Sequence, residues 1–175
     1  MTKVKHKVKH KITGEVLFAG DLSERFPCIL DGVNLSGADL RNQDFRFVDF
    51  NATNLTGADL RGANLVGADL RGVVLKGADL RGADPLDACF VNAELSCADL
   101  RGLKLKEINF SNANLFRANL RDANLICANF IDADLKFADL RNANLSCAFI
   151  RYADIAGANF SGACLWGTHY DGGER

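Results

Sequence analysis

The chain has 175 residues, of which 48% are hydrophobic and 25% are charged, and its formal net charge is −1. This composition suits one domain with a sizeable core and excludes a disordered chain. The near-neutral charge excludes a uniformly basic nucleic-acid binder, and no apolar run approaches the roughly 18 residues of a membrane span. The beginning of the chain lacks the apolar stretch of a secretory signal. We therefore expect a cytoplasmic protein that does not bind a membrane.

Lysines alternate with other residues at the start of the chain, which is the periodicity of a β-strand. They are Lys3, Lys5, Lys7, Lys9 and Lys11. Thr13 and Gly14 can turn the chain, and residues 15–18 can return as a second strand, so residues 1–27 are expected to form a small hairpin-like cap. This segment holds 6 Lys and Arg against 3 Asp and Glu. Its lysine face either binds nucleic-acid phosphates or protects an edge strand from aggregation.

A repeat of five residues begins at Leu30 and continues to Tyr170. Nearly every fifth residue is Leu, Phe or Ile, and a small residue, usually Ala, precedes it by two positions. The small residue and the central residue are two positions apart, so on an extended segment their side chains point to the same side. The central residue and the small residue of the next unit are three positions apart, so the chain must bend between them. Each unit is therefore expected to be a very short strand followed by a corner. Four such corners close one coil in about 20 residues.

Charged residues recur at the same interval and support this coil length. An arginine follows the central residue once per coil, at Arg41, Arg61, Arg81, Arg101, Arg121 and Arg141. A column of aspartates runs two positions before it and is interrupted by Asn119. These stripes form either a surface lattice of ion pairs or a surface that binds an anion or a protein.

The repeated A-(D/N)-L-x-x unit resembles the pentapeptide-repeat proteins over residues 28–170. The resemblance implies an all-β fold, a right-handed quadrilateral β-helix of about seven coils, with the Leu or Phe and the Ala positions inside. The expected organisation is a cap in residues 1–27, the β-helix in residues 28–170 and a C-terminal tail in residues 171–175. The resemblance also implies a bacterial or phage source.

The repeat is irregular near its middle. Pro85 takes a central position and cannot donate a ladder hydrogen bond, but the register resumes in the next unit. Two interpretations stay open: a local bulge at one corner, or a kink that presents Leu86 to a partner. Leu103 and Ile108 stand where Ala is usual, so they are expected to widen one coil or to fill space beside Pro85.

The last coil is rich in aromatic residues and has no cap comparable to the N-terminal one. Phe160, Trp166 and Tyr170 belong to it, and the register places Trp166 outside. An uncovered apolar edge of this kind predicts a homodimer through the C-terminal coils.

Reactive chemistry is hard to find in the sequence. Of the 6 cysteines, Cys127 and Cys147 share a column on adjacent coils, close enough in principle for a disulfide, although reduced thiols are expected in a cytosol. There is no C-x-x-C pair, phosphate-binding glycine motif or nucleophile elbow. His6 and His10 lack further ligands. The sequence therefore predicts no enzyme, no cofactor and no metal site.

The leading hypothesis is a non-catalytic, rigid rod that mediates protein–protein interaction. Some pentapeptide-repeat relatives imitate duplex DNA and inhibit type II topoisomerases, so the resemblance implies a modulator of DNA gyrase as an alternative. B-DNA carries one negative charge per about 1.7 Å, which residues 28–175, with 15 Lys and Arg against 19 Asp and Glu, do not approach. Nucleic-acid binding through the lysine-rich strand is the second alternative.

Overall fold

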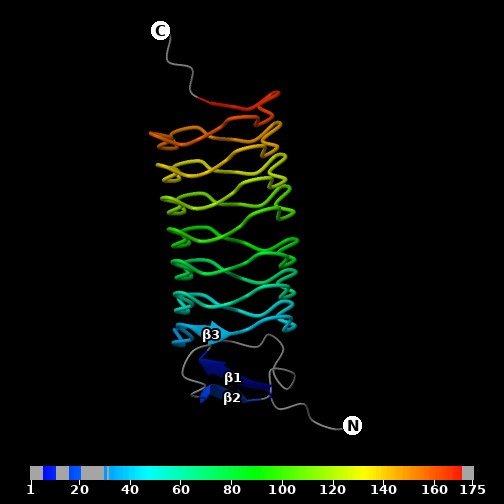
Figure 1. The fold of residues 1–175 in the computed structure, drawn as a ribbon, viewed down its shortest axis with the longest axis vertical. Coiled ribbons are helices and arrows are strands. Elements are labelled where there is room, and N and C mark those ends of the chain that lie inside the picture. Colours follow the sequence, from blue (N-terminus) through cyan, green and yellow to red (C-terminus); the bar gives the residue numbers. More distant parts are fainter. Residues whose placement is uncertain (1–5, 11–15, 21–29, 31, 171–175) are drawn as a thin grey trace.

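The computed structural model describes residues 6–10, 16–20, 30 and 32–170. The repeat region winds into coils stacked one on the next, which gives the molecule the shape of a rod (Figure 1). The two N-terminal strands lie beyond the first coil, at one end of this rod (Figure 1). No helix in these described ranges has the length and hydropathy needed to cross a membrane.

Adjacent coils are joined by parallel backbone pairing between residues that are one coil apart. The bridges run from Asn34 with Asn54 at the start to Phe149 with His169 at the end. Within the rod, the Leu60 N–H donates to the carbonyl of Asp79 at 2.8 Å. The spacing of the repeat therefore places Leu60 directly below the equivalent residue of the next coil, as the coil length inferred from the sequence requires.

The central hydrophobic residues and the small residues two positions earlier form one continuous core along the axis. On one face the central column is aromatic. Phe90, Phe110 and Phe130 are fully buried. The ring centroids of Phe90 and Phe110 are 5.1 Å apart, and those of Phe110 and Phe130 are 5.2 Å apart. Where Thr53 replaces Ala, its buried hydroxyl donates to the Leu30 carbonyl at 2.6 Å, so the polar group is satisfied. The division between inside and outside that the repeat predicts is confirmed.

Each corner is a tight turn stabilised by two kinds of hydrogen bond. The Leu60 carbonyl accepts the N–H of Ala63 at 3.0 Å, and the intervening Gly62 has a φ of 68°. A positive φ at the third residue is the property of a type II turn. The side chain of Asn64 accepts the N–H of Val66 at 3.2 Å, which is an Asx turn. The Asp or Asn of the repeat therefore holds the next corner in place.

The N-terminal strands form the hairpin expected from the alternating lysines. β1 (His6–His10) pairs antiparallel with β2 (Val16–Gly20) and, on its other side, with β3 (Ala38–Asp39), so the sheet order is β2-β1-β3. Lys9 lies opposite Asp39 in this pairing. The hairpin thus occupies the strand edge of the first coil. The side chains of the lysine face and the residues of the C-terminal tail lie outside the described part of the structure.

Candidate functional site

The backbone ladder is interrupted along one face of the rod, and we call this interruption the split. The regular pattern would join residues 82–87 to residues 101–106 through four hydrogen bonds. None of the four forms in this described stretch, and the residues whose backbone nitrogens lack their ladder bond are Gly82, Pro85, Asp87 and Lys104. The next bridge along the chain, between Cys89 and Asn109, is present. The bonds on either side are intact, from Leu80 N–H to Asp99 at 2.9 Å and from Phe90 N–H to the Asn109 carbonyl at 3.0 Å.

The split has two causes in the sequence. Pro85 is buried at a central position and has no N–H to donate to the Lys104 carbonyl. In the following coil Leu103 and Ile108 occupy the inward positions that Ala usually fills, and each is only 2% exposed. Because close-packed interiors do not absorb added methylene groups without movement, these two side chains hold the coils apart. The opening extends from the corner at Gly82 to the next corner at Asp87, so it is larger than the predicted bulge at one corner.

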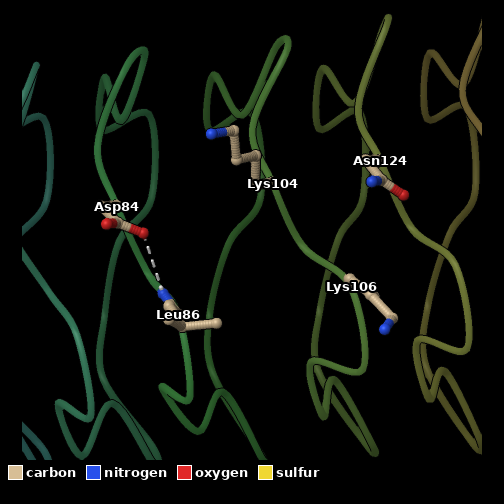
Figure 2. A pocket seen from close by; sticks show the side chains of 5 residues that line it. All are labelled: Asp84, Leu86, Lys104, Lys106 and Asn124. Atoms are coloured by element: carbon tan, nitrogen blue, oxygen red, sulfur yellow. Dashed lines mark hydrogen bonds between the residues drawn. The ribbon is translucent and has the colours of Figure 1, made fainter.

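A cavity of about 320 Å³ lies in the split, open to solvent (Figure 2). Its lining consists of Asp84, Leu86, Lys104, Lys106 and Asn124. The Leu86 side chain is 53% exposed and extends from its coil toward the coil of Lys106, whereas the Lys104 side chain extends back toward Asp84. The cavity therefore combines an exposed apolar side chain with charged groups of both signs.

Hydrogen bonding and ion pairing leave one cation of the split without a partner. The Asp84 carboxylate accepts the N–H of Leu86 at 3.3 Å, and Lys106 pairs with Glu107 at 3.1 Å. Among the described residues, Lys104 has no ion-pair partner within 4.0 Å. The split thus presents an unpaired ammonium group beside backbone donors and acceptors that have lost their ladder partners.

The predicted arginine column is a lattice of ion pairs. The Arg61 guanidinium lies 2.6 Å from Asp59 in its own coil and 3.6 Å from Asp79 in the next. The hydrogen bond from Arg61 lowers the pKa of Asp59 below its ordinary value, because it stabilises the carboxylate. Where Asn119 interrupts the aspartate column, Arg121 pairs instead with Asp122 at 3.3 Å. The column therefore presents neutralised pairs, and its use as a docking surface stays a prediction.

The final coil places its aromatic residues differently. Trp166 is 75% exposed, as its register predicts, whereas Tyr170 occupies a central position and is nevertheless 68% exposed. Phe160, also central, is partly buried against the core. Leu165 occupies a central position, which is buried from Leu30 to Leu145, and is 48% exposed. A homodimer through this edge stays a prediction.

The cysteines within the described residues are free thiols. Cys127 and Cys147 lie on adjacent coils in one column, as their spacing predicts. Across the described ranges there is no group of three His, Cys, Asp or Glu side chains that could hold a metal ion.

One surface cluster was missed by the sequence reasoning. The Arg117 guanidinium carbon lies 5.1 Å from the ring centroid of Phe116 and 5.9 Å from that of Phe137, which are cation–π contacts. Phe137 is 54% exposed. The signal was present, since Arg117 and Phe137 are one coil apart in the same column. Lys104 was also missed. Its position was a signal, because the residue one coil less one position after Pro85 is the one whose carbonyl would accept the hydrogen bond that proline cannot donate.

The parallel pairing, the corners and the filled axis define a right-handed quadrilateral β-helix. The family model for pentapeptide repeats matches residues 28–65, 53–92, 93–130 and 128–167, with 8 copies. The chain therefore belongs to the pentapeptide-repeat family.

Solved structures of this family resemble the rod. The chain is 28% identical to HetL, a pentapeptide repeat protein involved in heterocyst differentiation regulation from the cyanobacterium Nostoc, with a TM-score of 0.61 over 84% of this chain and 86% of HetL. It is 21% identical to full-length QnrB1, a plasmid-mediated fluoroquinolone resistance protein, with a TM-score of 0.53 over 83% of this chain and 81% of QnrB1. The second similarity concerns the fold alone. No curated protein sequence matches the chain significantly.

Proposed function

We propose that the protein is a non-catalytic rod that binds a partner protein at the split. The observation that carries the proposal is the loss of four successive ladder bonds in an otherwise regular ladder. Backbone groups released in this way can bind an extended segment of another chain, as sheet edges do in β-strand addition. The regulatory role given for HetL fits a family member that acts by binding.

The chemistry of the split specifies the kind of segment that fits. The free groups include both N–H donors, such as that of Lys104, and carbonyl acceptors, such as that of Lys106, which a peptide backbone complements with its own alternating groups. The unpaired ammonium group of Lys104 favours an acidic side chain beside that backbone. The exposed Leu86 offers an apolar contact. The partner is thus an extended segment with an acidic and an apolar residue.

The experiment uses three full-length proteins. One carries a photoreactive residue at position 86 in the split, the second carries it at position 71 on another face as a control, and the third is Pro85→Leu. The partner protein that each one captures or cross-links is identified by mass spectrometry. Pro85→Leu supplies the missing donor and is expected to close the split and abolish capture. We expect cross-links from position 86 only, within an extended acidic segment. Equal capture by Pro85→Leu, or cross-links from position 71 alone, would refute the proposal.

We also propose that the exposed final coil allows two copies to associate. The support is the exposure of Trp166 and Leu165 at the end of the core. Trp166→Ser with Leu165→Lys is expected to convert a concentration-dependent dimer into a monomer in light scattering. A wild-type protein that stays monomeric at high concentration would remove this proposal.

The two alternatives remain predictions that separate assays distinguish. A DNA mimic needs free negative charge, whereas carboxylates such as Asp59 and Asp79 are paired with arginines. Inhibition of DNA supercoiling by purified gyrase at micromolar protein would favour the mimic over the partner-binding rod. A salt-sensitive DNA shift that is lost on removal of residues 1–11 would favour the lysine strand.

A further inference from the structure

The geometry points to a modification site that is independent of the split: we propose that Cys127 and Cys147 are a dithiol that peroxides oxidise to a disulfide between adjacent coils. Both thiols occupy the same position in their five-residue units, two residues after the centre, with φ values of 56° and 58°. Cys127 N–H donates to the Ser146 carbonyl at 2.9 Å, so the ladder fixes one residue beside the other.

The distance between the two backbones suits a disulfide. Coils joined by ladder hydrogen bonds lie about 4.8 Å apart. The α-carbons of disulfide-linked cysteines are usually about 4.4–6.8 Å apart. The pair therefore needs no movement of the ladder to reach the required spacing.

The direction of the thiol is fixed by a second observation on the same column. Gly167 lies one coil after Cys147 in the same column, just as Cys147 lies one coil after Cys127. The Cys147 N–H donates to the Trp166 carbonyl at 2.9 Å, which is the same ladder bond as that from Cys127 to Ser146. A β-carbon placed on Gly167 would lie 3.3 Å from the Cys147 Sγ. In a disulfide the corresponding distance is roughly 3 Å, as follows from the S–S bond length. A thiol in this column thus points at the β-carbon of the next coil.

Another column with the same register shows that such side chains contact each other. The Asn142 side-chain amide donates to the Asp122 carboxylate at 3.0 Å, and these residues are one coil apart and two positions after their centres. The geometry of the corner therefore brings side chains in these columns together, and two sulfurs at Cys127 and Cys147 experience the same placement.

The other described cysteines lack this arrangement. Cys89 pairs across the ladder with Asp69 and Asn109. Cys164 pairs with Asn144, and its Sγ contacts the Ser146 hydroxyl at 3.2 Å. These two thiols have no cysteine at the neighbouring coil position, which makes Cys164 the matched control.

The oxidation is a two-step reaction with hydrogen peroxide. One thiolate attacks a peroxide oxygen and becomes a sulfenic acid, while the other oxygen leaves as hydroxide and is protonated to water. The second thiolate then attacks the sulfenic sulfur, the S–S bond forms and the sulfenic oxygen leaves as a second water. Two thiols lose two electrons and two protons, and one peroxide is reduced. Both side chains are half-buried, so the small oxidant reaches them.

The test treats the reduced, full-length protein with hydrogen peroxide, blocks remaining thiols and digests it with trypsin without reductant. Cleavage after Arg and Lys separates Cys127 in residues 122–136 from Cys147 in residues 142–151. We expect these two peptides to be joined in the monomer band of a non-reducing gel, and joined equally in Cys164→Ser. Cys147→Ser should lose the linked species.

A thermal measurement supplies a second readout. A disulfide that closes a loop of about this length is expected to raise the melting temperature by roughly 6–12 °C, and a reductant should reverse the rise. Links that involve Cys164 or Cys97, links found only between molecules, or two thiols that survive peroxide would each overturn the proposal.

Discussion

The split makes a direct prediction about the protection of single amides. In the regular ladder the Asp84 N–H donates to Ala63 and the Asn124 N–H donates to Leu103, each at 2.9 Å. The Lys104 N–H holds the equivalent position between them and has no ladder bond in the described structure. Amides without stable hydrogen bonds exchange with an opening free energy near zero. Lys104 is therefore expected to exchange far faster than Asp84 and Asn124.

Pro85→Leu is the perturbation that tests the cause. The new N–H can donate to the Lys104 carbonyl, and closing the split would form four bonds that are absent from the described structure. At about 0.5 kcal/mol for each exposed bond this amounts to about 2 kcal/mol. Loss of the proline costs about 1 kcal/mol, because the unfolded chain becomes more flexible. We expect a net gain of about 1 kcal/mol in the free energy of unfolding and a melting temperature higher by about 2–4 °C.

The assay is amide hydrogen exchange measured by NMR on the wild type and on Pro85→Leu, with a thermal melt of each. Protection of the Lys104 and Asp87 amides should appear in the variant. Leu103→Ala is the matched variant, because it removes one large side chain and leaves the proline. If Pro85→Leu lowers the melting temperature and leaves Lys104 unprotected, the missing donor is not what opens the face. If Leu103→Ala alone restores protection, the packing of the next coil dominates.

Three further predictions concern stability. Phe110→Ala should cost about 4–5 kcal/mol in urea denaturation, because the ring is fully buried between two others, whereas Phe137→Ala, half exposed, should cost under about 1 kcal/mol; equal costs would contradict the stacked core. Arginine hydrogen bonds lower the pKa values of five aspartates, Asp39, Asp59, Asp69, Asp79 and Asp139. The stability that these carboxylates contribute is therefore complete above their unfolded pKa of about 3.9 and is lost as the pH falls below it. A free energy of unfolding that is flat from about pH 5 to 2.5 would refute this, and Asp79→Asn should reduce the slope of that free energy with pH. Gly67→Ala would place a β-carbon 2.5 Å from the Phe47 ring, whereas Gly57→Ala, with nearly the same φ, meets no atom within 4 Å. Gly67→Ala should therefore be less stable than Gly57→Ala by about 1–2 kcal/mol. Equal melting temperatures of the two variants would show that the ring simply moves.

The period of the sequence was sufficient to predict the columns of this fold. The positions of Leu60 and Leu80 in the repeat predict their stacking, and the interval between Arg61 and Arg81 predicts the ion-pair lattice, because both depend only on the number of residues per coil. The handedness came from the family resemblance, since a spacing argument is the same for both hands. The docking of β1 on β3 could not be predicted, because Lys9 and Asp39 are far apart in sequence and no pattern links them.

The split was visible in the sequence only as separate irregularities. Pro85 removes one hydrogen bond, and alone it is compatible with a small bulge. Leu103 and Ile108 lie in the next coil, and their effect depends on how far a packed core can yield. Whether one bond or four are lost is decided by the balance between core packing and these weak hydrogen bonds. Such a balance is a property of the assembled coils and not of any single unit.

The split also gives the rod a preferred direction of bending. On the other faces, hydrogen bonds such as that from Leu80 to Asp99 resist separation of the two coils, while at the split only side-chain packing does so. A force that pulls the open face apart therefore meets less resistance than the same force applied to the opposite face. The two halves of the molecule are joined by something close to a one-sided hinge, and thermal tilting is confined largely to one plane.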